Sequence, residues 1–373
     1  MSTESLSDAI RQAGATGTAL RITGAMSWMH AGRPSSASQA ISVADERGIV
    51  DYVPDDLTMT VRAGTTLRDI DTAARANDQW LPLDPYGSEA GTIGATIATG
   101  SSGPLSHGFG AARDFLLGIE FVNGKGATIR AGGRVVKNVA GFDLMRLLCG
   151  SWGTLGVITE VTLRLYAVPK RERSVVFSPA AGRASDQDTI ALLRNSPIAP
   201  VAMELIDAKL AAVLGLPARD CVLIRLAGNE AVVAKQAQML GEIGMLEEVG
   251  GDAWLKLREL DREAPIGFRI SGLPAEVASL WDSAGKIFAG GADGWMHSTL
   301  SRGVVRVVAR RADMGALVAS IRALPSSSRT IFEVLPGDAW RDLSPNEISS
   351  RLSRSVKSAF DPLNILNPGV LGD

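Results

Sequence analysis

The sequence predicts an α+β protein built from about two domains, because its 373 residues exceed what one hydrophobic core usually holds. Short alternating strands and glycine-rich loops fill the first half, whereas the second half alternates predicted strands with amphipathic helices. The composition turns basic and loses its glycines near residue 170, where we place the boundary. We therefore expect a first domain at 1–170, a cap domain at 171–358, and a last segment at 359–373 that returns to the first domain.

The composition excludes several classes of function. Apolar residues make up 46% of the chain and charged residues 21%, which is typical of a globular protein. The 38 basic and 40 acidic side chains give a net charge of -2, and no basic cluster with interleaved aromatics occurs, so we expect no nucleic-acid partner. Only Cys149 and Cys221 are present, which predicts buried free thiols rather than a disulfide framework, a zinc site or an iron–sulfur cluster held by this chain alone.

We expect no targeting signal at the start of the chain. Residues 1–6 lack the basic and apolar regions of a secretory signal, and no later window contains eighteen continuous apolar residues. We therefore expect a cytoplasmic chain with no transmembrane segment.

The stretch 87–110 is the feature around which we expect the first domain to be organised. It is rich in Gly, Ser and Thr, and no charged side chain occurs from Ala90 to Ala112. Such small residues let main-chain N–H groups approach a ligand, and the run from Thr92 predicts a short helix whose N-terminus attracts anions. A diphosphate would suit this stretch. On these residues alone, a glycine loop that only permits flexibility or tight packing remains an open alternative.

The remaining elements of the first half surround this stretch. A strand at 19–23 runs into Gly24–Ser27, a second candidate phosphate loop. A capping box at Thr66 predicts a helix to about residue 76, and Asn123–Gly124 predicts a hairpin turn. A second glycine loop at 150–156 follows a short helix at 143–148. Further strands are predicted at 40–43, 49–53, 57–62, 115–122, 127–130 and 157–165.

The second half reads as an α+β cap. It carries a predicted helix at 229–240, and we detect no internal repeat and no low-complexity tract. The end of the chain, 360–369, is rich in turn residues but keeps its apolar residues, so we expect it to pack onto the rest of the protein. The predicted strands of the cap are 221–226, 268–271, 304–308 and 331–335.

Taken in order, these motifs resemble a known family. The strand before Gly24, the segment 92–104, Arg113–Asp114, the run 133–138 and the loop 150–158 resemble the FAD-binding domain of the vanillyl-alcohol-oxidase (PCMH) superfamily. The ending Phe-Asp-Pro-x-x-x-x-Asn-Pro-Gly at 360–369 is similar to that of its 2-hydroxy-acid dehydrogenase branch. Within that branch the chain resembles the smaller flavin-type subunits of bacterial glycolate oxidases. The resemblance implies a PCMH-type FAD-binding domain of two subdomains, followed by the α+β cap.

The resemblance also implies which residues hold FAD. Ala25 and Met26 stand where the family usually has glycine, and Phe142 replaces its usual tyrosine. No histidine lies in the first loop, so the resemblance implies noncovalent FAD, and we interpret His107 as a hydrogen-bonded loop residue rather than a covalent anchor. The implied FAD-binding residues are Gly24, Ala25, Met26, Ser27, Gly91, Thr92, Ile93, Gly94, Thr99, Gly100, Ser101, Ser102, Gly103, Arg113, Lys137, Asn138, Gly153, Gly156, Val157, Ile158 and Asn367.

The catalytic residues are less clearly indicated. Oxidation of a 2-hydroxy acid requires a base for the hydroxyl proton, a hydride acceptor, and a cation that holds the carboxylate. The large dehydrogenases of this branch use paired histidines and a glutamate that bind a metal, but the cap here has only His297, so we expect no metal site. Lys137, next to the flavin by resemblance, and His297 are the two catalytic candidates. For each, a solvated lysine or a satisfied core histidine is the open alternative.

Three interpretations of the function follow. In the first, the chain is the FAD-binding subunit of a glycolate oxidase, working with a larger FAD-linked dehydrogenase subunit and an iron–sulfur subunit on a small 2-hydroxy acid. That complex would associate with the inner face of the membrane only through its partners. In the second, the chain is a stand-alone FAD-dependent oxidoreductase acting on a hydroxy acid, alcohol or sugar. In the third, it is an assembly subunit without catalysis. The missing cap ligands disfavour the second, and the intact glycine loops disfavour the third.

Overall fold

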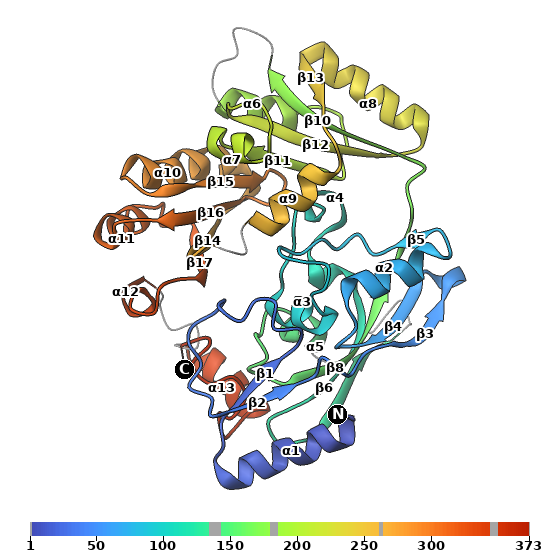
Figure 1. Ribbon diagram of the computed structural model, residues 1–373, viewed down its shortest axis with the longest axis vertical. Coiled ribbons are helices and arrows are strands. Elements are labelled where there is room, and N and C mark those ends of the chain that lie inside the picture. The colour runs from blue at the N-terminus through green and yellow to red at the C-terminus, as the bar shows by residue number, and fades with distance from the viewer. Residues whose placement is uncertain (1, 134–142, 180–185, 261–263, 344–349, 373) are drawn as a thin grey trace. The chain divides into compact units, whose positions relative to one another are not determined.

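The computed structural model of the protein describes residues 2–133, 143–179, 186–260, 264–343 and 350–372 (Figure 1). The chain divides into two compact units. The first unit comprises Met1–Ser102, Gly110–Val168 and Pro345–Asp373, and the second comprises Gly103–Phe109 and Pro169–Ser344. The domain limits expected from the sequence remain a prediction. The compact units differ from them in two places, because Gly103–Phe109 belongs to the second unit and the C-terminal part of the first unit begins at Pro345.

A helix and a small parallel β-pair begin the first unit. Helix α1 (Thr3–Thr16) starts at Ser2, whose side chain accepts from the Ser5 N–H, and ends at Gly17. Strand β1 (Leu20–Thr23) pairs in parallel with β2 (Gln39–Ser42) and also bridges Leu366 near the C-terminus. The apolar face of α1 packs on these segments, so the end of the chain is part of this core. The shared core residues are Leu6, Ile10, Ala13, Leu20, Ile41, Val43, Val122, Val157, Ile365 and Leu366.

A five-stranded antiparallel sheet forms the larger part of the first unit. The hairpin predicted at Asn123–Gly124 joins β6 (Leu116–Val122) to β7 (Thr128–Gly132), with the Asn123 side chain accepting from two backbone N–H groups. The helix predicted from Thr66 is α2 (Leu67–Arg75), capped by the Thr66 hydroxyl. In spatial order the strands are β3 (Ile49–Val53), β4 (Thr58–Arg62), β8 (Val157–Arg164), β6 (Leu116–Val122) and β7 (Thr128–Gly132).

Shorter elements complete the first unit. The helix predicted from Thr92 is α3 (Ile93–Thr99), and the helix predicted before the second glycine loop is α5 (Leu144–Leu148). Strands β5 (Gln79–Trp80) and β9 (Tyr166–Ala167) pair with each other. Helix α13 (Arg351–Phe360) leads into the C-terminal segment. One-turn 3₁₀ helices occur at Pro54–Asp56 and Ala112–Phe115.

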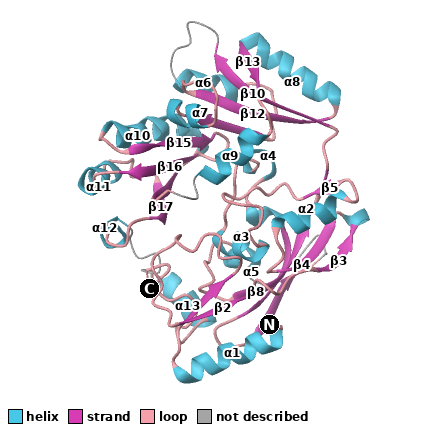
Figure 2. Ribbon diagram, in the orientation of Figure 1, coloured by secondary structure: helices cyan, strands magenta, loops and turns pink. Residues whose placement is uncertain are grey.

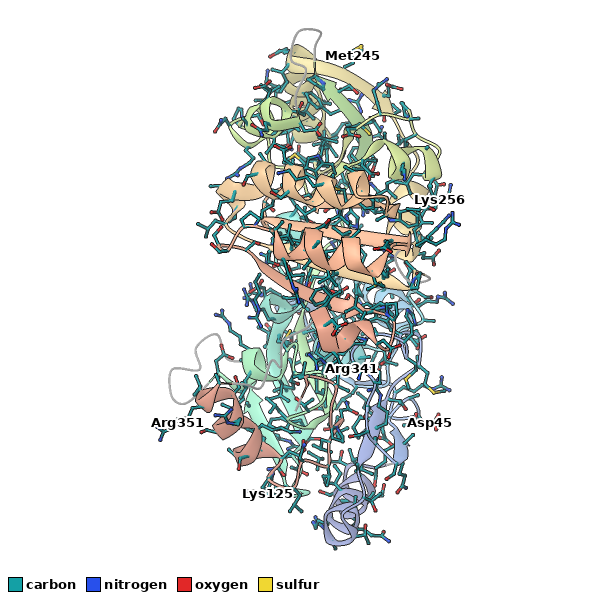
Figure 3. The ribbon with its side chains drawn as sticks, turned by 90° about the vertical axis from the view of Figure 1, so that its left-hand side faces the viewer. Asp45, Lys125, Met245, Lys256, Arg341 and Arg351 are labelled. Carbon is teal, nitrogen blue, oxygen red and sulfur yellow. The ribbon has the colours of Figure 1, made fainter. Side chains whose placement is uncertain are left out.

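The second unit is an eight-stranded antiparallel sheet (Figure 2). Its spatial order is β13 (Gly244–Glu248), β10 (Arg171–Pro179), β12 (Cys221–Gly228), β11 (Ala202–Ile206), β15 (Asp293–Thr299), β16 (Val304–Arg311), β14 (Ile266–Ser271) and β17 (Arg329–Val334). β13 and β17 are its edges, and Met245 on β13 is exposed (Figure 3). The predicted α+β class is therefore confirmed, and so are the four strands and the helix predicted for the cap.

Helices cover one face of this sheet and share its main hydrophobic core. Alternate strand residues such as Val222, Ile224, Phe268 and Val307 point into that core. The helices that contribute to it are α6 (Asp186–Arg194), α8 (Glu230–Ile243), α10 (Val277–Ala289), α11 (Met314–Arg322) and α12 (Ala339–Leu343). The other helices of the unit are α4 (Ser106–Phe109), α7 (Ala208–Val213), α9 (Asp252–Leu260) and a 3₁₀ turn at Pro274–Glu276.

The second unit repeats one supersecondary pattern, although no internal repeat is detected in the sequence. Apart from the additional helix α7 between β11 and β12, the order β10–α6–β11–β12–α8–β13 recurs as β14–α10–β15–β16–α11–β17. The second strands of the two halves, β11 and β15, pair in the middle of the sheet. The repeat is one of topology. Alternating apolar residues are enough to build each half, so the two halves need no sequence identity that a search would detect.

Candidate functional site

The first glycine loop follows β1 directly and lies against the start of α3. A Cβ atom on Gly24 would come 2.4 Å from the Thr92 hydroxyl oxygen, so only glycine allows this approach. Met26 adopts φ 55°, a left-handed conformation that favours glycine, and its side chain is 65% exposed. A glycine, which the resemblance implies at this position, would adopt this backbone conformation with less strain.

The N-terminus of α3 is tied to the preceding chain. The N–H groups of Gly91, Ile93 and Gly94 donate to the carbonyls of Ser88 (2.9 Å), Thr65 (2.9 Å) and Ala63 (2.8 Å). The Thr92 hydroxyl accepts from the Ala95 N–H, and a Cβ on Gly94 would lie 2.7 Å from Ala63 Cβ. These donors are engaged within the protein, so tight packing explains Gly94, and anion binding by this helix end remains a prediction.

The C-terminal end of α3 is where the two glycine-rich loops meet. The N–H groups of Gly150 and Trp152 donate to the carbonyls of Ile97 (3.0 Å) and Ala98 (2.8 Å). A Cβ on Gly100 would lie 3.3 Å from Gly150 Cα, so the backbones are nearly in contact. The second loop thereby caps the carbonyl end of the helix.

The first loop reaches the second through two aromatic rings. Trp28 stacks on Trp152 with ring centroids 5.9 Å apart. Trp152 itself has φ 54°, and the Gly32 Cα faces its ring closely enough that a Cβ would lie 3.1 Å from it. The structure therefore brings together three segments that the sequence analysis placed around one ligand: the loop after β1, the end of α3, and the loop before β8.

The C-terminal segment joins these loops. The buried Asn367 accepts from the Ile22 N–H through Oδ1 (2.7 Å) and donates from Nδ2 to the Trp152 carbonyl (2.7 Å). Lys357 on α13 donates to the carbonyls of Thr154 (2.9 Å) and Leu366 (3.3 Å) and pairs with Asp361 (2.8 Å). We call Lys357, Asp361 and Asn367 the C-terminal clamp.

The cap places its histidine in a buried pair. His297 on β15 has Nδ1 2.9 Å from Glu204 Oε2 on β11, and the Thr299 hydroxyl donates to Glu204 Oε1 (2.5 Å). All three side chains are buried. His297 is thus satisfied by a carboxylate, a partner that the sequence analysis missed because Glu204 is 93 residues away.

Further ionisable groups continue along the same sheet. Arg306 lies opposite His297 in register and forms an ion pair with Glu333 (2.5 Å), which also lies 3.5 Å from Arg269. We call Glu204, His297, Arg306, Arg269 and Glu333 the cap ionisable row. Because they alternate with strand residues of the helix-covered core, they lie on the opposite face of the sheet. Among the described residues, no group of His, Cys, Asp and Glu has the arrangement of a metal site.

His107 differs from the expectation for it. Its ring Nδ1 is buried and has no hydrogen-bond partner among the described residues, and burial lowers the pKa of the ring to about 4. The segment around it joins the sheet of the second unit, where the Gly108 N–H donates to the Val201 carbonyl (3.2 Å) and the Ser301 hydroxyl to the His107 carbonyl (3.3 Å).

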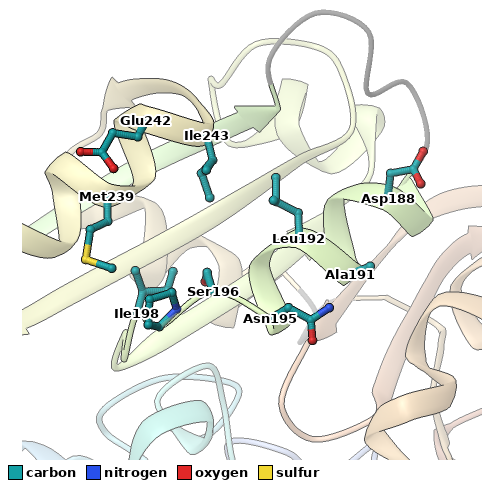
Figure 4. A pocket seen from close by; sticks show the side chains of 10 residues that line it. Asp188, Ala191, Leu192, Asn195, Ser196, Ile198, Met239, Glu242 and Ile243 are labelled. Atoms are coloured by element: carbon teal, nitrogen blue, oxygen red, sulfur yellow. The ribbon is translucent and has the colours of Figure 1, made fainter.

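A cavity of about 660 Å³ lies elsewhere in the second unit, between α6 and α8 (Figure 4). Its floor is apolar and includes Leu192, Ile198 and Ile243, which pack against the core of the helix layer. None of the site residues predicted from the sequence lines it.

Comparison with known proteins decides the family. The sequence profile described as "FAD binding domain" matches residues 1–132. The glycolate oxidase subunit GlcE of Escherichia coli is 34% identical over 377 residues, which cover 98% of this chain and 96% of that protein. The chain belongs to the GlcE family. The predicted resemblance to glycolate oxidase subunits, and the FAD cofactor that it implied, are thereby confirmed.

Other relatives of this GlcE-family chain agree. The glycolate oxidase subunit GlcD of Bacillus subtilis is 27% identical, covering 86% of the chain and 76% of that protein. The D-lactate dehydrogenase of Archaeoglobus fulgidus is 28% identical, covering 82% of the chain and 75% of that protein. The chain is therefore a flavoprotein and belongs to the FAD-dependent hydroxy-acid oxidoreductases.

Solved structures show the same fold at low identity. The 4-ethylphenol oxidase of Gulosibacter chungangensis aligns with a TM-score of 0.72 at 16% identity, covering 100% of this chain and 88% of that one. An alkyldihydroxyacetonephosphate synthase aligns with a TM-score of 0.69 at 17% identity, covering 98% of this chain and 75% of that one. At this identity they establish the fold, and the PCMH-type prediction is confirmed.

The residues where the loops meet fit FAD. Ser101 and Ser151 each bury a hydroxyl oxygen that has no partner among the described residues, and such groups are costly unless a ligand or water satisfies them. Ser102 is engaged differently, because its hydroxyl accepts from the Ala112 N–H (2.9 Å). Uncharged donors beside closely approaching backbone are suited to a dinucleotide diphosphate.

The remaining predicted site residues have mixed surroundings. Arg113 is largely exposed and lies 3.9 Å from Asp114, and the Thr99 hydroxyl donates to the Ala95 carbonyl (2.8 Å). A Cβ on Gly156 would lie 2.5 Å from the Phe121 ring, and Val157 and Ile158 open β8 as buried residues. Gly103 falls in the second unit, and Lys137, Asn138 and Phe142 lie outside the described residues. Cofactor contact by any of them stays a prediction.

Two expectations about the chain as a whole can be compared directly. Neither cysteine forms a disulfide; Cys221 is buried as expected, whereas Cys149 is only partly buried. In the part of the chain that the structure describes, no helix has the length and apolar character needed to cross a bilayer.

Proposed function

We propose that this chain is the FAD-binding subunit of a glycolate oxidase, which converts glycolate and related 2-hydroxy acids to 2-oxo acids and passes the electrons to an iron–sulfur partner. The observation that carries the proposal is the match to E. coli GlcE over nearly the full length of both chains. That relative is named as a subunit, which supports a multi-subunit complex.

The loops of the first unit supply the cofactor site. Bound FAD would supply the redox chemistry by which this chain takes part in passing electrons through the complex. The chain's own contribution is to hold the dinucleotide with Ser101, Ser151 and nearby main-chain groups, and to fix the loops through Trp28 and Trp152. No histidine occurs in Gly24–Ser27, so the proposed binding is noncovalent.

The partners are proposed from what the chain itself lacks. Its two cysteines lie in different units, so an iron–sulfur cluster would have to be carried by a separate subunit. We place most of the substrate chemistry on a larger FAD-linked dehydrogenase subunit. In this arrangement the chain is cytoplasmic and meets the inner face of the membrane only through the complex.

The cap ionisable row favours a second candidate, a stand-alone oxidoreductase. An imidazole oriented by a buried carboxylate, as in His297–Glu204, is the arrangement that accepts a hydroxyl proton, and Arg306 is the adjacent cation for a carboxylate. Lys137 remains the other catalytic candidate from the sequence.

Anaerobic addition of glycolate to the purified, FAD-loaded chain separates the candidates. The proposed function predicts that the visible absorption of the flavin persists until the larger flavin subunit and the iron–sulfur subunit are added. Bleaching by the isolated chain would instead establish the stand-alone enzyme. A chain that retains no flavin would support the assembly subunit.

A further inference from the structure

We propose that Asn367 is a positioning residue for the cofactor site. Its amide fixes the distance between the strand that enters the first glycine loop and the second glycine loop, and thereby sets the affinity for FAD. The inference rests on the FAD binding of the proposed function and goes beyond it, because it assigns Asn367 a role that acts through the loops rather than by contact with the cofactor.

Three hydrogen bonds carry the inference. The Asn367 N–H donates to the Leu20 carbonyl (2.8 Å), Oδ1 accepts from the Ile22 N–H (2.7 Å), and Nδ2 donates to the Trp152 carbonyl (2.7 Å). The first two bonds hold β1 just before it enters the loop at Gly24, and the third holds the loop that caps α3. Both polar atoms of the side chain are therefore used to join protein segments.

The residue type follows from this geometry. One side chain must offer an acceptor and a donor side by side, which only Asn and Gln do, and it must stand on a backbone with φ 45°. Asn tolerates this left-handed conformation better than longer or branched residues. Asp would keep the acceptor and lose the donor.

The same amide explains a glycine of the second loop. A Cβ on Gly153 would lie 2.7 Å from Asn367 Nδ2, which is too close for any side chain. Gly153 was expected to contact FAD, but room for the Asn367 amide is a sufficient reason for glycine at this position.

The rest of the C-terminal clamp makes the segment rigid enough to act in this way. The carboxylate of Asp361 accepts from the N–H groups of Ile365 (3.1 Å) and Leu366 (2.9 Å) and pairs with Lys357. Lys357 in turn holds the Thr154 carbonyl in the second loop. Asn367 is thus anchored on one side by its own segment and on the other by the loop that it positions.

The variant Asn367→Asp tests the proposal against the matched control Asn364→Asp. Asn364 lies on the same segment and also has a left-handed backbone, φ 49°, but it is exposed. The flavin-depleted full chain is titrated with FAD, and binding is followed by quenching of flavin fluorescence. The thermal midpoint of the same flavin-depleted protein is measured in parallel.

We expect N367D to bind FAD at least about tenfold more weakly than N364D, the equivalent of one lost hydrogen bond of ordinary strength. The Asp side chain loses a buried hydrogen bond, so the thermal midpoint of N367D should fall below that of the control, and FAD is titrated at a temperature at which circular dichroism shows both variants fully folded. Equal FAD affinities of the folded variants would overturn the proposal. So would a loss of affinity that disappears once only the folded fraction is counted, because the residue would then act on the fold alone.

A second variant, Asn367→Gly, keeps the left-handed backbone and removes the amide, so it serves if N367D does not fold. The same weakening of FAD binding is expected for it, and failure of both variants to fold would overturn the proposal. If the wild-type chain itself binds no FAD, the proposed function fails, and that result is distinct from any outcome among the variants.

Discussion

Replacement of Lys357 by Met tests whether the buried ion pair of α13 holds the C-terminal segment. Lys357 Nζ lies 2.8 Å from Asp361 Oδ2, and the two side chains are 8% and 0% exposed. Removal of one partner of a buried pair costs about 3–5 kcal/mol, because the other charge stays in the interior without its counter-ion. Asp361 keeps two backbone N–H donors. We therefore expect the free energy of unfolding to fall by about 3 kcal/mol, the lower end of this range.

The matched control is Lys256→Met in α9 (Figure 3). Lys256 and Asp252 have the same residue types, the same spacing of four residues and the same 2.8 Å distance, but their side chains are 55% and 64% exposed. Exposed pairs contribute little to stability, so the control should unfold like the wild type. The assay is urea unfolding followed by far-UV circular dichroism. A loss below about 1 kcal/mol for K357M, no more than the contribution of a single hydrogen bond, would show that the ion pair does not hold the segment.

His107 predicts a pH dependence of stability, because burial lowers the pKa of its ring from 6.5 to about 4. The unfolded chain binds the ring proton at a higher pH than the folded chain does. The free energy of unfolding should therefore fall by up to about 3 kcal/mol as the pH decreases from 6.5 to about 4. His107→Gln should remove that slope in unfolding titrations, and an unchanged slope would contradict the assignment. Gly94→Ala places a Cβ 2.7 Å from Ala63 Cβ, so overpacking should lower stability by about 1–3 kcal/mol in the same assay, whereas a stable variant would remove the packing explanation. Glu204→Gln should leave glycolate oxidation by the complete complex unchanged, because the substrate chemistry is proposed for the larger subunit. A loss of about 10²-fold or more at normal flavin content would instead make His297 the base.

Much of the fold could be predicted from local signals. The capping hydroxyls of Thr66 and Thr92 mark the starts of α2 and α3, and Asn123–Gly124 marks the β6–β7 turn. Each signal is contained within a few residues, which is why these elements could be predicted. The topological repeat of the second unit could not be predicted, because it is defined by strand order and not by any local motif.

The loops of the site could be predicted from the sequence, whereas the side chains that hold those loops in place could not. The density of Gly, Ser and Thr pointed to the segments that meet at the end of α3. The supports depend on partners distant in sequence: Lys357 binds the carbonyl of Thr154 across 203 residues, and Glu204 binds His297 across 93. The hydrophobic periodicity of a sequence does not indicate which distant residues form such pairs. Asn367 was singled out by the ending of the chain, but its engagement with β1 and the second loop required the structure.

The flavin content of the purified full chain decides whether the glycine loops of the first unit bind a dinucleotide. After incubation with excess FAD and removal of the free cofactor, we expect one FAD per chain, released in full when the protein is denatured. Protein that emerges folded but colourless would contradict this expectation, since the meeting point of the glycine loops would then hold no dinucleotide.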